Sequence, residues 1–292
     1  NVFGSLSMIE RKLQELNDDG IRNSIGKEFQ KIVKIKYNAD IETKKLIKSS
    51  QGVHIILEKK FLDSPHAIMI PHTTDGRVLF AVPWKNYVVV GTTDTQITDT
   101  LDEPKPLKEE IDFILNNASK YMSIKPSKKD IKSVFTGLRP LASTSNKKST
   151  KEVSRSHKIN ISTTGLISIL GGKWTTYRKI AEDAVDASIP LAGLRKRKCK
   201  TKKLRIHGFK RRVDWDDPLH VYGSDIRKLK SYGSLIDNKS LSKKFFISNS
   251  IIYWSVTKEM AMTVEDVLAR RTRCLFLDSA ESVRIAPQVA NK

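Results

Sequence analysis

An apolar segment that ends in two glycines, followed by an amphipathic segment, constrains the fold of this chain more than any other feature. Residues 165–172 are apolar and end in Gly171 and Gly172, and residues 173–187 carry apolar side chains at helical spacing. This pattern predicts a strand, a tight turn and a helix. Glycines would let an anion or a polar ring edge approach the N–H groups of the first helical turn, where the helix dipole is positive. The same pattern is typical of plain tight connections, so the turn alone does not establish a binding site.

The remaining segments predict an α/β protein, of the α+β type, with a helical C-terminal part. β-forming residues are concentrated in short segments at 53–57, 78–82, 87–90, 134–135 and 159–161. The second and third of these are expected to form an antiparallel hairpin. Residues 104–121 have helical spacing, and Glu109 and Glu110 lie near the start of this predicted helix, where carboxylates suit the helix dipole. Further helices are predicted at 224–235, 245–262 and 263–277.

Net charge restricts the partners of the chain. Its 292 residues include 53 Lys and Arg against 32 Asp and Glu, which gives a net charge of +21. Nucleic acid, anionic lipid and phosphorylated metabolites are therefore candidate ligands. Between Arg195 and Arg212, 11 of 18 residues are basic and none is acidic, so we interpret this run as a solvated linker between two folded parts. No recognisable nucleic-acid-binding module accompanies the run, so we do not expect nucleic acid as the partner.

Composition excludes several classes of protein. With 39% hydrophobic and 29% charged residues, most of the chain is expected to fold. No run of about 18 apolar residues could span a bilayer. The two cysteines, Cys199 and Cys274, are too few for a disulfide framework and indicate a reducing compartment. The six histidines have no metal-binding spacing, and neither a GxSxG motif nor a P-loop occurs, so we expect no metal site and no nucleoside-triphosphate chemistry.

Three segments could supply chemistry. Arg139 lies between Gly137, which allows close approach, and Pro140, which fixes the backbone; its guanidinium could clamp a phosphate or carboxylate, or pair with a neighbouring acid. His54 lies in an apolar strand and could be a core residue or a proton acceptor. Residues 91–95, Gly-Thr-Thr-Asp-Thr, could form a turn or a hydrogen-bonding edge for a ligand, and the spacing alone favours the turn.

The order of these segments resembles one family, the FAD-dependent glycerol-3-phosphate dehydrogenases. The resemblance covers about residues 46–285 and is most specific at 165–178, Gly-Leu-Ile-Ser-Ile-Leu-Gly-Gly-Lys-Trp-Thr-Thr-Tyr-Arg. It also includes residues 50–55, 90–95, 137–141 and 154–157, and in the C-terminal part 221–224, 259–261 and 265–273.

The resemblance implies an arrangement of domains. A β-rich substrate domain is joined to the closing strand and helix of a flavin-binding fold, and a small all-helical domain follows. On this basis we expect a poorly matched helical or loop segment at 1–45, the substrate domain with the flavin-fold strand and helix at 46–190, the basic linker at 191–212 and the helical domain at 213–292.

The resemblance also implies a reaction and a site. The family oxidises the C2 alcohol of sn-glycerol 3-phosphate to the ketone of dihydroxyacetone phosphate by hydride transfer to FAD, and the electrons pass to a quinone at the membrane. Arg139, Arg155 and Lys173 would line the substrate site, although the position of Arg155 in the sequence alone favours an exposed surface residue. His54 would assist proton removal, and the base could be His54, Arg139 or Lys173. The residues that would face the pyrimidine edge of the flavin are Gly171, Gly172, Lys173, Trp174, Thr175 and Thr176.

One motif of the family is missing from this sequence. None of the 14 glycines forms the GxGxxG turn that holds the FAD pyrophosphate. We therefore expect the chain to be part of a larger enzyme, to bind FAD weakly or not at all when isolated, and to be inactive alone. The expected partners are glycerol 3-phosphate, a quinone and an anionic membrane surface, with a cytoplasmic location at the inner membrane and a homodimer as one option for assembly. The alternative is a basic protein that binds nucleic acid or an anionic membrane without catalysis.

Overall fold

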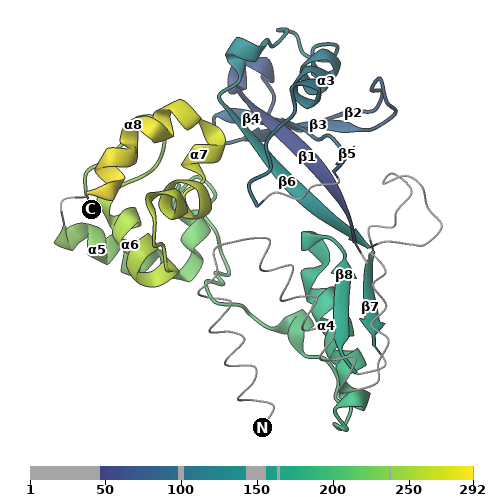
Figure 1. Ribbon diagram of the computed structural model, residues 1–292. Helices are drawn as coiled ribbons and strands as arrows, with labels where there is room; N and C mark the ends of the chain where they lie inside the picture. Colours follow the sequence, from purple (N-terminus) through teal and green to yellow (C-terminus); the bar gives the residue numbers. More distant parts are fainter. Residues whose placement is uncertain (1–46, 98–101, 143–155, 163–164, 237, 292) are drawn as a thin grey trace, which may run out of the picture. The chain divides into compact units, whose positions relative to one another are not determined.

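The computed structural model describes residues 47–97, 102–142, 156–162, 165–236 and 238–291 (Figure 1). The segment predicted at 1–45 lies outside these residues. Contacts divide the described residues into two units, one with 49–140 and 199–292 and the other with 47–48, 141–142 and 156–198. The predicted domain boundaries stay predictions, and each unit is described by itself.

A sheet forms the centre of the larger unit. Its strands are β1 (Ile47–Glu58), β2 (Ile68–Ile70), β3 (Leu79–Trp84), β4 (Tyr87–Gly91), β5 (Thr95–Gln96) and β6 (Ser133–Ala142). They follow the order β2-β3-β4-β1-β5, and β6 also pairs with β1. The pairs of β4 with β1 and β3, of β2 with β3 and of β5 with β1 are antiparallel. The predicted hairpin is therefore confirmed as β3 and β4, joined by a turn in which Lys85 has a positive φ of 56°.

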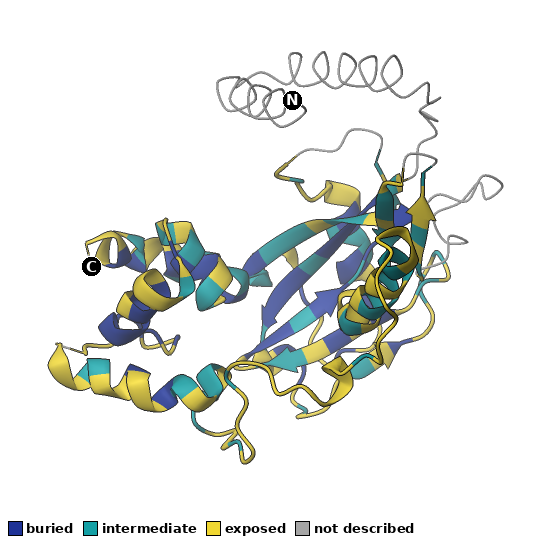
Figure 2. Cartoon of the chain, turned by 90° about the horizontal axis from the view of Figure 1, so that it is seen from below, coloured by how far each residue is buried: buried dark blue, intermediate teal, exposed yellow. Residues whose placement is uncertain are grey.

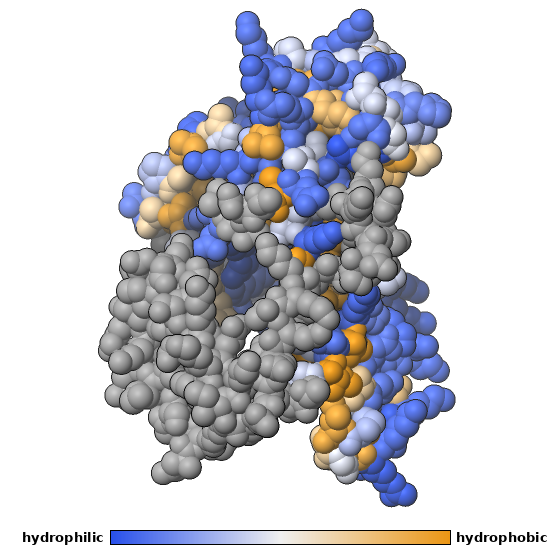
Figure 3. Space-filling model, turned by 45° about the vertical axis from the view of Figure 1, so that its right-hand side comes forward, coloured by the Kyte–Doolittle hydropathy of each residue, from blue (hydrophilic) through white to orange (hydrophobic). Residues whose placement is uncertain are grey.

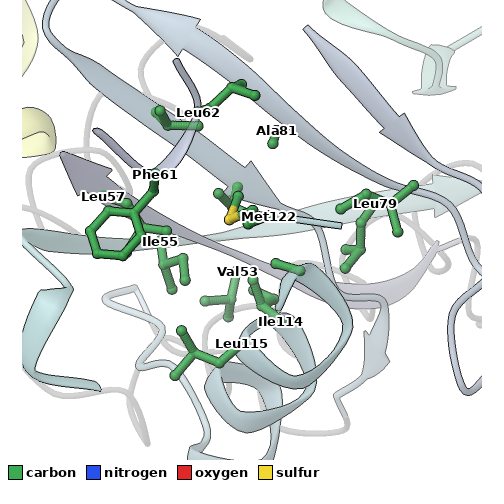
Figure 4. Close-up of a cluster of buried hydrophobic side chains, with 14 residues drawn as sticks. Val53, Ile55, Leu57, Phe61, Leu62, Leu79, Ala81, Ile114, Leu115 and Met122 are labelled. Carbon is green, nitrogen blue, oxygen red and sulfur yellow. The ribbon is translucent and has the colours of Figure 1, made fainter. Parts of the chain in front are cut away.

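Strand β1 is buried on both faces, because its alternate side chains enter two different cores. Val53, Ile55 and Leu57 are fully buried in one core, together with Ile114 and Leu115 of helix α3 (Lys108–Ala118) (Figure 4). Ile56, whose side chain points to the opposite face, enters the second core. Buried residues accordingly run along the strands in Figure 2. Fully burying one such side chain stabilises the fold by about 1.5–3 kcal/mol.

The second core joins the sheet to the C-terminal helices. Ile56 of β1 is buried in the same cluster as Leu277 and Ile285. The C-terminal helices are α5 (Ile226–Leu235), α6 (Asn249–Glu259), the π-helical turn η7 (Asp266–Arg271), α7 (Cys274–Leu277) and α8 (Ser279–Ala290). The larger unit also contains short 3-10 turns: η1 (Lys59–Phe61), η2 (Lys128–Asp130), η5 (Thr201–Lys203) and η6 (His220–Asp225). The sheet is therefore covered by α3 on one face and by the C-terminal helices on the other.

The helix predicted at 263–277 is two helices in the structure. Thr263 and Asp266 cap the first, since the Thr263 hydroxyl accepts from the Asp266 N–H and the Asp266 carboxylate accepts from the Thr263 N–H. Arg273, with a φ of 66°, then breaks the helical path before α7. Helix α8 was not predicted from the sequence.

The smaller unit contains the predicted strand, turn and helix. Strand β8 (Ile167–Gly171) pairs antiparallel with β7 (His157–Ile161). The 3-10 turn η4 (Trp174–Thr176) leads into α4 (Tyr177–Leu191), so the α-helix begins four residues later than the sequence pattern suggests. Both the α/β fold class and this local motif are confirmed.

The basic run is solvent-exposed. Every residue of 195–212 except Cys199 and Gly208 is exposed, which agrees with the predicted solvated linker. More generally, the described part of the face drawn in Figure 3 is mostly hydrophilic, with smaller groups of hydrophobic side chains between. Within the described residues, no helix combines the length and the apolarity that crossing a bilayer requires.

Candidate functional site

Arg139 of β6 is held in place by strand β1 and by the segment that joins β4 to β5. A Cβ atom at Gly52 of β1 would lie only 2.1 Å from Nη2 of Arg139, so the guanidinium lies directly against the glycine backbone. Its Nη1 donates to the Thr93 carbonyl oxygen at 3.1 Å, and its Nη2 donates to the Thr92 hydroxyl at 2.9 Å. Gly137, where the sequence predicted the close approach, has no atom within 4 Å of its Cβ position. The close approach therefore lies at Gly52, and Arg139 supplies a positive charge in a fixed position.

The segment that accepts these hydrogen bonds is a β-bulge. His54 pairs with Gly91, and Gln51 pairs with Thr95, so that three steps along β1 lie opposite four steps along the other chain segment. The extra residue falls between Gly91 and Thr95, and bulges of this kind re-aim groups next to functional sites. The sequence left open whether residues 91–95 form a turn or a ligand edge. The structure makes them the support of Arg139.

His54 lies two residues beyond Gly52 on the same face of β1. Its ring is half-buried and stacks on Phe135 of β6, with ring centroids 4.9 Å apart and an interplanar angle of 13°. Gly91 pairs with His54 on the neighbouring strand β4, and a Cβ atom at Gly91 would lie 2.5 Å from Cδ2 of His54. Burial, and next the positive charge of Arg139, lower the pKa of His54 to about 4. The imidazole is therefore neutral at neutral pH and able to accept a proton.

The predicted flavin-facing residues form one turn in the smaller unit. Gly171 and Gly172 have positive φ values of 68° and 91°, and a Cβ atom at Gly172 would lie 2.6 Å from Cδ1 of Ile180. Both glycines are thus required by the turn itself. Lys173 is exposed, and its carbonyl oxygen accepts from the N–H and the hydroxyl of Thr176.

This turn offers a cofactor the exposed start of a helix. Residues 173–176 are all exposed, and the first N–H groups of a helix have no partner within the helix. An anionic or polar ring edge fits such a position because the helix dipole is positive there. The residues present therefore fit one edge of a flavin ring, whereas the sequence has no GxGxxG turn to hold its pyrophosphate.

Within each unit the structure brings predicted site residues together. His54 and Arg139 are neighbours in the larger unit, and residues 171–176 form one turn in the smaller unit. Arg155 lies outside the described residues. Sequence reasoning did not assign roles to Gly52, Gly91 or Phe135, because each acts through a neighbour that is distant along the chain. The only available signal was the presence of glycines within predicted strands, which indicates close approach by another group.

Comparison with known proteins gives two matches that overlap at residues 162–178. Residues 36–178 match the sequence model of the family described as "FAD dependent oxidoreductase", and residues 162–292 match the model described as "C-terminal domain of alpha-glycerophosphate oxidase". The two matches define the class: proteins in which an FAD-dependent oxidoreductase domain is followed by this C-terminal domain.

Individual relatives specify the family further. A mitochondrial glycerol-3-phosphate dehydrogenase of Arabidopsis thaliana is 33% identical over 92% of this chain and 50% of its own length. A probable mitochondrial enzyme of the same name from Dictyostelium discoideum is 34% identical over 84% of this chain and 42% of its length. The crystal structure of the Bacillus halodurans glycerol-3-phosphate dehydrogenase complexed with FAD matches with a TM-score of 0.65 and 27% identity, covering 84% of this chain and 53% of that one. This chain belongs to the FAD-dependent glycerol-3-phosphate dehydrogenase family, and it spans about half the length of the relatives it matches.

Proposed function

We propose that this chain supplies the substrate-binding part of an enzyme that oxidises sn-glycerol 3-phosphate to dihydroxyacetone phosphate. The observation that carries the proposal is Arg139, whose guanidinium is fixed by Gly52 and by Thr92 and Thr93 beside a neutral His54. A fixed guanidinium suits a phosphate or an oxygen that gains negative charge. The family membership supports the choice of substrate.

Arg139 and His54 would have different roles in the reaction. Arg139 would bind the phosphate or the C2 oxygen of the substrate. His54 would accept a proton on its unprotonated ring nitrogen, but a group with a pKa of about 4 is a weak base at neutral pH. A bound phosphate would offset the charge of Arg139 and thereby raise the pKa of His54. Substrate binding would in this way make His54 a better proton acceptor.

FAD would supply the hydride acceptor when it is bound. We propose that the exposed turn at 171–176, with Lys173 at the start of η4, faces the pyrimidine edge of its ring. Because the 292 residues contain no pyrophosphate-binding GxGxxG motif, we expect the isolated chain to bind FAD weakly or not at all and to be inactive.

Ligand binding to the chain as it exists tests the proposal without requiring turnover. Isothermal titration calorimetry with sn-glycerol 3-phosphate should give binding that Arg139→Gln weakens at least about tenfold. Glycerol, which lacks the phosphate, serves as the negative control, and Gly137→Ala serves as the control variant because that position is open. Equal affinity for glycerol and glycerol 3-phosphate, or no effect of Arg139→Gln, would refute the proposed substrate site.

Activity is tested by adding the missing motif. Co-expression with an N-terminal segment of a relative that carries GxGxxG should restore reduction of a quinone-like dye by glycerol 3-phosphate. A folded complex with bound FAD that fails to reduce the dye would count against the reaction. A quinone as acceptor and a homodimeric assembly stay predictions of the family resemblance.

We further propose that the basic run docks on an anionic membrane surface, which agrees with a peripheral location at an inner membrane. Exposed apolar side chains lie among its basic residues, at Leu204, Ile206 and Phe209. Near an acidic bilayer each Lys or Arg contributes about 1 kcal/mol. Flotation with vesicles of phosphatidylcholine, with and without phosphatidylglycerol, tests this docking. Replacing the lysines and arginines of 200–212 by glutamine should abolish flotation with the acidic vesicles, and unchanged flotation would refute the assignment.

A further inference from the structure

A buried carboxylate lies behind the β-bulge that supports Arg139. Glu110 of α3 is 4% exposed and accepts four hydrogen bonds. Its Oε1 accepts from the hydroxyls of Thr93 and Thr95 at 2.8 and 2.7 Å, and its Oε2 accepts from Gln51 Nε2 at 2.7 Å and from the Leu107 N–H at 3.0 Å. Burial would raise the pKa of Glu110, but these hydrogen bonds together bring it below its ordinary value. The carboxylate is therefore ionised, and it ties Thr93 and Thr95 of the bulge to β1 and α3.

Thr93 connects this carboxylate to Arg139. Its hydroxyl donates to Glu110 and accepts from the Val53 N–H at 2.9 Å, whereas its carbonyl oxygen accepts from Nη1 of Arg139. Gln51 and Gly52 are consecutive in β1 and so point to opposite faces of the sheet. Glu110 bonds to Gln51 on one face, and Arg139 lies against Gly52 on the other. The bulge is the direct link between the two faces.

We infer that Glu110 is a positioning residue: it fixes the bulge so that the Thr93 carbonyl and the Thr92 hydroxyl hold Arg139 at the substrate site. Glu110 acts through Thr93 rather than on the substrate. The inference rests on the proposed function only in what Arg139 binds, because the fixing of Arg139 is measurable with no substrate present.

The ionisation of His54 is the measurement, since Arg139 is the charge that acts on it. NMR titration of the full chain, with the His54 signal assigned by its loss in His54→Gln, follows the imidazole directly. In Glu110→Gln one carboxylate oxygen becomes an N–H₂ group that cannot accept, so the bulge loosens and Arg139 moves away from its position. The pKa of His54 should then rise by about half a pH unit or more, within the range of a displaced neighbouring charge. Loss of the negative charge of Glu110 by itself would change the pKa in the opposite direction.

A double-mutant comparison separates positioning from a general loosening of the fold. In the Arg139→Gln background, Glu110→Gln should no longer raise the pKa of His54, because the group through which Glu110 acts is gone; the pKa should stay unchanged or fall slightly with the lost negative charge. Glu109→Gln is the matched control, since Glu109 is the exposed neighbour on the same helix, and it should have no effect.

The outcomes are distinct from those of the substrate test. A fall or no change of the pKa in folded Glu110→Gln, or an equal rise in both backgrounds, would overturn the inference even if glycerol 3-phosphate binds. If Glu110→Gln does not fold, Thr93→Val decides the question with the same measurement. It removes the hydroxyl that reaches Glu110 and keeps the carbonyl that Arg139 contacts, and the pKa of His54 should again rise in that variant.

Discussion

Adding one methyl group at Gly52 should displace Arg139 while leaving the strand intact. The new Cβ would lie 2.1 Å from Nη2 and 2.4 Å from Cζ of Arg139, far inside van der Waals contact. The atoms in its way belong to the end of a flexible side chain, so the guanidinium can move. Gly52→Ala is therefore expected to fold, with Arg139 no longer bound to Thr92 and Thr93.

The structure sets the magnitude of this effect. Arg139 loses two hydrogen bonds from a charged donor, and each such bond contributes about 1.5–3 kcal/mol when buried. Because Arg139 is only half-buried, water replaces part of this, and we expect the free energy of unfolding to fall by about 1–2 kcal/mol. The dissociation constant for sn-glycerol 3-phosphate should rise about ten- to a hundredfold, since Arg139 leaves its position.

Urea denaturation in two backgrounds tests the reasoning. In Arg139→Ala the steric conflict is absent, and Gly52→Ala should then be neutral or stabilise the strand by about 0.5 kcal/mol. The sign of the effect thus reverses with Arg139. Gly137→Ala is the matched control, because its Cβ position is open, and it should be neutral or slightly stabilising in both backgrounds. The same destabilisation by Gly52→Ala with and without Arg139 would show that the methyl group conflicts with something else.

Three further predictions also concern the larger unit. Gly91→Ala should lower Tm by more than Gly52→Ala does. Its Cβ would meet the Val53 carbonyl oxygen at 2.9 Å as well as the His54 ring, and a backbone atom cannot move aside as a flexible side chain can. Thermal denaturation of both variants checks the order of the two Tm values. Saturating glycerol 3-phosphate should raise the pKa of His54 in an NMR titration, and an unchanged or lower value would contradict binding at Arg139. Hydrogen bonds from Arg284 and Ser242 lower the pKa of Glu281 from 4.5 to about 2, so its stabilising contribution is present above about pH 4.5 and is lost as the pH falls towards 2. Glu281→Gln should therefore lower stability at pH 7 and flatten this acid-induced loss in urea denaturation curves, and a parallel curve would refute the assignment.

The sequence predicted those features that depend on neighbouring residues. The strand, glycine turn and helix at 165–187 are visible because apolar spacing and two glycines occur in one continuous stretch. The hairpin of β3 and β4 follows for the same reason. The sequence makes Arg139 and His54 candidates, the family resemblance assigns them to the site, and the structure places them beside each other. Their roles in catalysis remain part of the proposal.

The supports of the site were not visible in the sequence, because they are long-range contacts. Glu110 was expected to act on the helix dipole, as its exposed neighbour Glu109 can, whereas the structure buries Glu110 under the bulge. No property of the local sequence distinguishes the two acids. The need for glycine at position 52 similarly arises only because β6 pairs with β1 and places Arg139 against it. The fold must be known before either contact can be predicted.

The core that joins the sheet to the C-terminal helices determines which pieces of this protein can be inherited or exchanged as units. Ile56 belongs to the region matched by one family model and Leu277 to the region matched by the other, yet both are buried in one cluster. A cut within residues 162–178, where the two matched regions overlap, would leave each piece with a large apolar surface in water, which promotes aggregation. A C-terminal part taken from a relative would have to bring side chains that fit Ile56 and Tyr87 of the sheet. Because Phe276 of α7 contacts Phe135, on which His54 stacks, a poorly fitting exchange would also alter the surroundings of His54.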